Sequence, residues 1–126
     1  MRRVLLVSLF VVYGCAMEVV RTPVDLTPIN EAQARRVVTI KPVEIVLDSR
    51  YSRTISAGIV LLEVGSVSSG RVFKPVNTVF TVEGKHVHEA NFVLRNNRLV
   101  GFYLPVEKAF SPLSQSVVLP IKEGNH

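Results

Sequence analysis

From Val37 onward, short segments rich in β-branched and aromatic residues alternate with turn-forming residues, at intervals of about eight to twelve positions. Strands at this spacing, with turns between them, are typical of all-β barrels and sandwiches. We therefore predict an all-β fold, a small barrel or sandwich of about six or seven strands.

Seven segments of the chain are predicted to be strands. Pro42 interrupts the first of them, which indicates either an edge strand or a break in pairing. The polar residues 48–58 are expected to form a loop. The strands are expected over residues 37–47, 59–64, 71–76, 77–82, 85–94, 99–105 and 116–121.

A hairpin turn is the sharpest local prediction, over the sequence RNNR at residues 95–98. Asparagine tolerates positive φ, which suits the two central positions of a tight turn. A two-residue loop places Arg95 opposite Arg98 and Phe92 opposite Gly101. The like-charged pair is unfavourable by roughly a few tenths of a kcal/mol. The two arginines are either a partner-binding feature or simply solvated charges at a loop tip.

The first residues have the pattern of an export signal. Arg2 and Arg3 precede the uncharged segment Val4–Val12, and small residues follow it. Nine helical residues would rise about 14 Å, roughly half of a bilayer core, which is too short for a membrane span. The alternative is a buried strand or helix of the folded domain.

Val12-Tyr13-Gly14-Cys15 resembles the lipobox of bacterial lipoproteins. Val12 and Gly14 fit that pattern, whereas Tyr13 is bulky where a small residue is usual. The resemblance implies a diacylglyceryl thioether on Cys15, cleavage before it and a further acyl chain on the new amine. Ala16 stands where an aspartate often retains enterobacterial lipoproteins at the inner membrane, so the resemblance favours the outer membrane. The alternative is an ordinary signal peptide that leaves a free thiol.

These features predict three regions, a signal peptide over residues 1–14, a membrane tether over 15–36 and a β-rich domain over 37–126. Thr27 and Pro28 suit the N-cap and first position of a short helix over 28–36, or else the tether continues there. Cys15 is the only cysteine, so a disulfide within the chain is excluded.

His86 and His88 are the only polar pair with the spacing of metal ligands, and Glu89 follows them. Residues two apart on a strand share a face, so both imidazoles could hold one metal ion. The alternative is an ordinary pair of hydrogen-bonded histidines. No G-x-S-x-G or phosphate-binding glycine motif is present, and we expect neither enzymatic activity nor a cofactor.

Residues 101–113, GFYLPVEKAFSPL, combine three aromatic side chains with two prolines. They form either a core strand leading into a loop or an exposed apolar loop that docks onto a partner through Phe102, Tyr103 and Phe110. Residues 77–107 also loosely resemble small proteobacterial lipoproteins, a likeness that implies no activity.

The positive charges are scattered, although the chain carries a formal net charge of +5, so no nucleic-acid partner is expected. The sequence predicts an outer-membrane lipoprotein of the cell envelope that faces the periplasm. Its expected role is a non-catalytic binding or accessory component of an envelope assembly, with the membrane and an envelope protein as partners. The alternatives are a small-ligand or metal-binding lipoprotein that uses the His86/His88 face, and a purely structural envelope protein.

Overall fold

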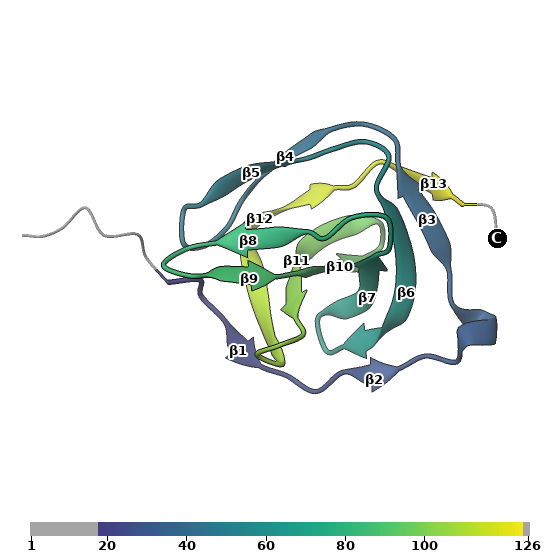
Figure 1. Ribbon diagram of the computed structural model, residues 1–126, viewed down its shortest axis with the longest axis horizontal. Helices are drawn as coiled ribbons and strands as arrows, with labels where there is room; N and C mark the ends of the chain where they lie inside the picture. Colours follow the sequence, from purple (N-terminus) through teal and green to yellow (C-terminus); the bar gives the residue numbers. More distant parts are fainter. Residues whose placement is uncertain (1–17, 125–126) are drawn as a thin grey trace, which may run out of the picture.

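The structure is a computed structural model that describes residues 18–124, and these residues form an all-β domain (Figure 1). They contain thirteen strands and one 3-10 helix, η1 (Glu31–Gln33). The predicted fold class is therefore confirmed, but the expected number of strands, six or seven, is too low. Within residues 18–124, no helix is long and apolar enough to cross a membrane.

One nine-stranded antiparallel sheet forms most of the domain. Its strands follow the order β1-β12-β11-β10-β7-β6-β3-β13, and β2 pairs with β6 beside this path. Three of its eight pairings join consecutive strands, and the other five bring together strands that are further apart in the chain. The strands are β1 (Thr22–Pro23), β2 (Thr27–Pro28), β3 (Arg36–Thr39), β6 (Val60–Val67), β7 (Gly70–Pro75), β10 (Asn91–Arg95), β11 (Arg98–Leu104), β12 (Ala109–Val118) and β13 (Ile121–Glu123).

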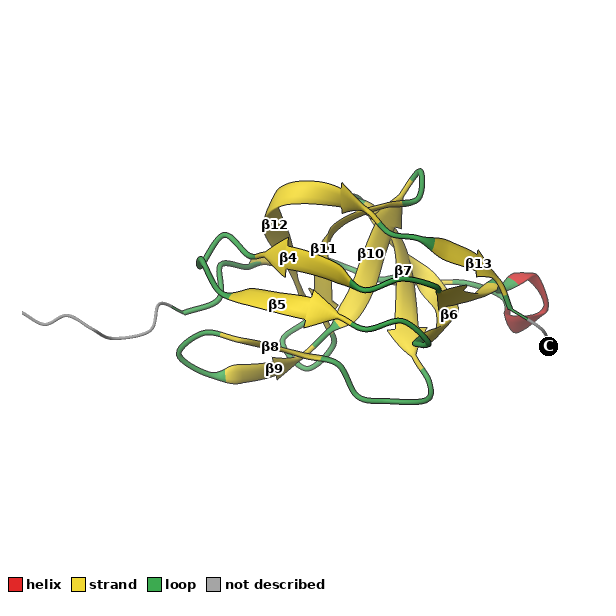
Figure 2. Ribbon diagram, turned by 90° about the horizontal axis from the view of Figure 1, so that it is seen from above, coloured by secondary structure: helices red, strands yellow, loops and turns green. Residues whose placement is uncertain are grey.

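Two small hairpins complete the fold. The first joins β4 (Val43–Val46) to β5 (Ser52–Ile55), and the second joins β8 (Thr81–Glu83) to β9 (Val87–Glu89). Figure 2 shows their strands running across the direction of β7 and β10 in the main sheet. The domain is thus sandwich-like, with the hairpins as a short second layer.

Three phenylalanines form the centre of the core between these layers. The Phe80 ring lies 4.9 Å from Phe92 and 5.4 Å from Phe102, and Phe92 and Phe102 are 5.5 Å apart, measured between ring centroids. All three side chains are buried. Phe80 precedes β8, while Phe92 and Phe102 face each other across β10 and β11. The aromatic core therefore connects the β8–β9 hairpin to the main sheet.

The N-terminal segment lies against the domain, and the predicted helix over residues 28–36 is wrong apart from the single turn of η1. Thr27 and Pro28 pair with Ser66 and Gly65 as strand β2 instead. Gly65 makes this approach possible, because a Cβ there would lie 2.3 Å from the Thr27 carbonyl oxygen. Asn30 caps η1 and accepts a hydrogen bond from the Ala32 backbone N–H.

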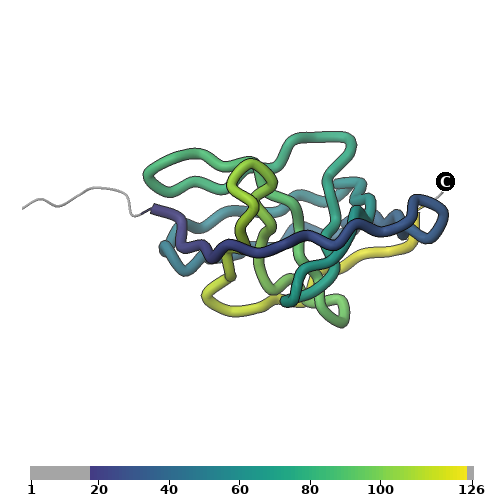
Figure 3. The backbone as a smooth tube through the Cα atoms, turned by 90° about the horizontal axis from the view of Figure 1, so that it is seen from below, coloured from purple at the N-terminus to yellow at the C-terminus, as the bar shows by residue number. Residues whose placement is uncertain are grey.

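The predicted tether over residues 15–36 does not hold for residues 18–36. Val19 is buried, β1 pairs with β12, and the Val24 N–H donates to the Lys108 carbonyl oxygen at 3.1 Å. Figure 3 shows this segment running along the outside of the domain from β1 to η1. The folded domain therefore begins well before Val37.

Several predicted strand boundaries differ from the structure: residues 77–82 contain only the start of β8, and residues 116–121 contain the end of β12 and the start of β13. The segment 85–94 is two strands, because the chain leaves the β8–β9 hairpin at Ala90 and enters the main sheet as β10. The segment 37–47 divides at Pro42 into β3 and β4, as one of the two alternatives predicted. Strand β5 lies in the segment predicted to be a loop. Its sequence SRTI is mostly polar and buries only one side chain completely, so it lacks the apolar pattern that predicts a strand.

Candidate functional site

An ionic cluster joins the beginning of the described chain to the β8–β9 hairpin. It consists of Glu18, His86, His88 and Glu107, and we call it the histidine–glutamate cluster. His88 Nδ1 lies 2.8 Å from Glu107 Oε2, and His88 Nε2 lies 3.3 Å from Glu18 Oε1. His86 Nδ1 lies 2.8 Å from Glu18 Oε2. The cluster thus links β9, the loop between β11 and β12, and the N-terminal segment.

The two histidines have different environments. The His88 side chain is 4% exposed and the His86 side chain is 65% exposed. Both ring nitrogens of His88 face carboxylate oxygens. A neutral imidazole carries one N–H, so donation from both nitrogens requires the positively charged ring. The two carboxylates therefore offset the cost of burying His88.

The electrostatics of Glu18 follow from these contacts. The hydrogen bond from His86 lowers the pKa of the Glu18 carboxyl from 4.5 to about 2, with help from the Val19 backbone N–H. Arg21 also lies 3.7 Å from Glu18. The carboxylate is therefore held in its charged form by neighbouring donors.

The prediction that His86 and His88 share a metal ion is not supported by this arrangement. Among residues 18–124, no three His, Cys, Asp or Glu side chains are grouped so that they could hold one. His86 precedes β9, which begins at Val87, so strand alternation does not place both rings on one face. The carboxylates already occupy both ring nitrogens of His88.

The turn at Asn96 and Asn97 is confirmed. These residues have φ angles of 52° and 64°, and Arg95 pairs with Arg98. The predicted pairing of Phe92 with Gly101 is wrong, because a bulge between β10 and β11 shifts the register and places Phe92 opposite Phe102.

The two arginines at this turn are exposed, but only Arg98 is fixed. Its Nε donates to Ser116 Oγ and its Nη2 donates to the Ser116 carbonyl oxygen, both at 3.0 Å. These hydrogen bonds draw Arg98 toward β12, away from a direct contact with Arg95. Their interpretation as partner-binding residues stays a prediction.

The three aromatic residues proposed to dock onto a partner do not form an exposed loop. Phe102 belongs to the aromatic core, and Tyr103 is 5% exposed in a smaller cluster with Val72 and Val93. The half-buried Phe110 packs against that second cluster. Its ring lies over Gly101, where a Cβ would come within 2.7 Å of Phe110 Cζ. Phe102 and Tyr103 are therefore core residues, and the docking interpretation is wrong for them.

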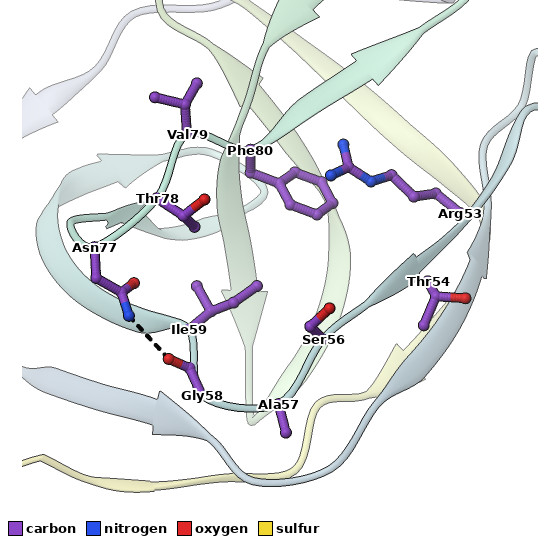
Figure 4. Close-up of a pocket in the computed structure, with 10 residues that line it drawn as sticks. All are labelled: Arg53, Thr54, Ser56, Ala57, Gly58, Ile59, Asn77, Thr78, Val79 and Phe80. Atoms are coloured by element: carbon purple, nitrogen blue, oxygen red, sulfur yellow. Dashed lines mark hydrogen bonds between the residues drawn. The ribbon is translucent and has the colours of Figure 1, made fainter.

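A hollow of about 260 Å³ opens between the β5–β6 connection and the loop before β8 (Figure 4). The Arg53 guanidinium lies over the Phe80 ring, 3.9 Å from its centroid. It also donates from Nη1 to the Thr81 carbonyl oxygen and to Thr81 Oγ1. At the other end, Asn77 donates to the Gly58 carbonyl oxygen and accepts from the Val60 N–H, both at 3.0 Å.

Sequence reasoning missed this hollow, because Arg53 and Phe80 meet only through the arrangement of the β4–β5 and β8–β9 hairpins. In the sequence, Arg53 is one of the scattered positive charges. Nothing in its local sequence distinguishes it from Arg50, which is exposed.

A second hollow, of about 450 Å³, lies between η1 and β6. Ile29, Leu62 and Val64 provide apolar walls. The buried Glu63 also lines it, but Arg71 Nε lies 2.7 Å from Glu63 Oε2, and the Arg35 backbone N–H donates to Oε1 at 3.1 Å. The negative charge of Glu63 is thus already neutralised within the fold.

Cys15 lies outside the residues that the structure describes. Comparison with protein-family models, curated proteins and solved structures finds no match for this chain. The functional interpretation therefore depends on the residues themselves.

Proposed function

We propose that the protein is an outer-membrane lipoprotein that faces the periplasm and is anchored through Cys15. Its domain serves as a non-catalytic binding or accessory component of an envelope assembly. The observation that carries the proposal is the sequence of the first fifteen residues, in which Arg2 and Arg3, an uncharged segment and the lipobox-like Val12–Cys15 follow one another. A thioether-linked lipid contributes about 0.8 kcal/mol per buried methylene, and two or more chains hold a protein stably.

The polar contacts of the domain support a binding role over catalysis. A catalytic histidine needs a ring nitrogen within reach of the proton that it transfers. In His88, both ring nitrogens face carboxylate oxygens, so neither is free to exchange a proton with a substrate. These side chains hold segments of the domain together.

The start of the domain supports a position close to the bilayer. Glu18 follows Cys15 by three positions, and Glu18 is held by His86 and His88. Fully extended, three residues reach about 10 Å. An anchor at Cys15 would therefore keep the β8–β9 hairpin, which lies at this end of the domain in Figure 1, next to the lipid headgroups. Such confinement raises the effective concentration of a weak binding module near membrane partners.

Fractionation of cell envelopes tests the anchor. The unaltered chain is expected to stay with the outer membrane after a high-salt wash, and mass spectrometry should find an acylated Cys15 at the mature N-terminus. Cys15→Ser should remove the lipid and release the protein into the soluble fraction. Normal processing and membrane retention of Cys15→Ser would overturn the lipoprotein assignment.

A second variant tests the sorting step separately. Ala16→Asp should leave lipidation intact and move the protein to the inner membrane. Ala16→Ser is the matched control and should remain in the outer membrane. Affinity capture of the anchored chain from solubilised envelopes, compared with Cys15→Ser, tests the accessory role. If the two forms recover the same proteins in equal amounts, the anchor is not needed for assembly.

A further inference from the structure

We propose that the hollow beside Arg53 is a binding site for a small carboxylate, with the Arg53 guanidinium as its anchor. The assignment is independent of the membrane anchor. It comes from a fixed, half-buried positive charge that faces an open hollow and has no acidic partner.

Arg53 differs from the arginines that serve structural roles. Arg21, Arg35 and Arg71 pair with glutamates at 3.7, 2.6 and 2.7 Å, respectively. Among residues 18–124, no aspartate or glutamate lies within ion-pair distance of Arg53; its partners are the Phe80 ring and Thr81. A partly desolvated charge without a counter-ion is unfavourable. A bound anion would remove that cost.

The contacts of Arg53 fix its orientation in advance. The Phe80 face and the Thr81 carbonyl hold the guanidinium from two directions, and Thr81 engages only Nη1. The Nε and Nη2 groups remain as donors, and guanidinium edges bind carboxylates through two parallel hydrogen bonds. A side chain already held in place loses little conformational entropy when the ligand binds.

The rest of the hollow suits a ligand with a short apolar part. Figure 4 shows the Ser56 and Thr78 hydroxyls on its two rims and Ile59 between them. Ser56 Oγ and Thr78 Oγ1 have no hydrogen-bond partner within residues 18–124, so both can donate to an anion. No acidic side chain lines the hollow. A volume of about 260 Å³ lies just below the range of sites for drug-sized ligands, roughly 300–1,000 Å³, which favours a small acid or the end of a peptide.

Calorimetric titration of the full chain, purified in a non-ionic detergent at pH 7 and low salt, tests the site. The probes are butyrate, N-acetyl-alanyl-alanine and the C-terminal amide of that dipeptide. We expect saturable binding of the two acids and none of the amide, because only the acids offer a carboxylate to Arg53. Tighter binding of the dipeptide than of butyrate would identify a peptide C-terminus as the source, and equal binding a free small acid.

Four variants show whether Arg53 carries the binding. Arg53→Gln should weaken binding by about tenfold or more, and Arg53→Lys should weaken it less, because a lysine keeps the charge without the paired donors. Ser56→Ala changes an exposed side chain on the opposite rim and should weaken binding about threefold without affecting folding. Arg95→Gln, the matched control at the β10–β11 turn, should bind like the unaltered chain.

Three results would overturn the proposal. The first is that neither acid binds up to about 50 mM, and the second is that the acid and amide dipeptides bind equally well. The third is that Arg95→Gln and Arg53→Gln lose the same affinity for the acids. The 50 mM limit corresponds to a binding free energy of only about −1.8 kcal/mol. If Arg53→Gln unfolds, Ser56→Ala and the acid–amide comparison still decide the question.

Discussion

The β8–β9 hairpin is attached to the domain in two different ways. On the β8 side, Phe80 enters the aromatic core and contacts Phe92 and Phe102. On the β9 side, His88 enters the histidine–glutamate cluster and contacts Glu18 and Glu107. The first attachment depends on apolar burial, which is insensitive to pH and salt near neutrality. The second depends on charge and therefore on pH and salt. We call the aromatic contacts of Phe80 the unconditional attachment and the contacts of His88 the conditional attachment.

The β8–β9 hairpin is short. Each of its strands has three residues, and an isolated two-stranded hairpin is at best marginally stable in water. Its position must come from tertiary contacts. Since Glu18 belongs to the conditional attachment, the N-terminal segment and the hairpin are held to each other.

Removing the central ring of the unconditional attachment should have the largest effect. Phe92→Ala is expected to lower the free energy of unfolding by about 3–5 kcal/mol, because it leaves a cavity beside Phe80 and Phe102. Guanidinium chloride unfolding at pH 7 measures the loss. Phe110→Ala is the matched control and should cost clearly less, because this half-buried ring only packs against the smaller cluster. Equal losses would show that the aromatic core is not the dominant attachment.

Substitution of either histidine should have an intermediate effect on the free energy of unfolding. The two variants compare a buried side chain with an exposed one. His88→Ala should cost about 2 kcal/mol at pH 7, because it removes charged hydrogen bonds from two carboxylates around a side chain that is 4% exposed. His86→Ala should cost less than about 1 kcal/mol, since an exposed ion pair contributes little. The same unfolding experiment compares the two variants.

A double-mutant cycle of His88→Ala with Glu107→Ala then isolates the coupling between the two side chains. A coupling energy near zero, or a larger loss in His86→Ala than in His88→Ala, would contradict the assigned roles. His86→Ala is the internal control, because its ring also contacts Glu18 but stays in solvent.

The sequence predicted the tight turn between β10 and β11 but not the strand register beyond it. The turn at Asn96 and Asn97 and the pairing of Arg95 with Arg98 follow from residues that tolerate positive φ. The register beyond the turn did not follow, because the bulge that places Phe92 opposite Phe102 depends on packing against other strands. Likewise, Thr27-Pro28 fits a helix start and an extended strand equally well, and only the approach to Gly65 selects the strand.

The candidate sites depend on contacts that are distant in sequence. His88 and Glu18 are 70 residues apart, and Arg53 and Thr81 are 28 residues apart. The spacing of His86 and His88 indicated a cluster, but it could not show that carboxylates from two other segments satisfy the rings. The strand predicted over residues 99–105 corresponds to β11, but the pattern of residues 101–113 left open whether Phe102 lies in the core or in an exposed loop.

The pH dependence of stability should show the smallest effect and test the conditional attachment directly. The pKa of Glu18 is about 2 in the folded chain and near 4.5 when its contacts are lost. Between these values the unfolded chain binds more protons than the folded one, so acid favours unfolding. The contribution of Glu18 is therefore fully present above about pH 4.5 and disappears as the pH falls toward 2. Its charged neighbours are His86, His88 and Arg21.

Glu18→Gln removes this titration while preserving the size of the side chain. Its stability relative to the unaltered chain should improve as the pH falls from 5 to 2.5, measured by chemical unfolding at each pH. Glu31→Gln is the matched control, because Glu31 lies on η1, at the opposite end of the domain from β9 (Figure 1). Parallel pH profiles for the unaltered chain and Glu18→Gln would show that the cluster does not hold the N-terminal segment. The hairpin would then depend on its aromatic attachment and on the hydrogen bonds from Arg53 to Thr81.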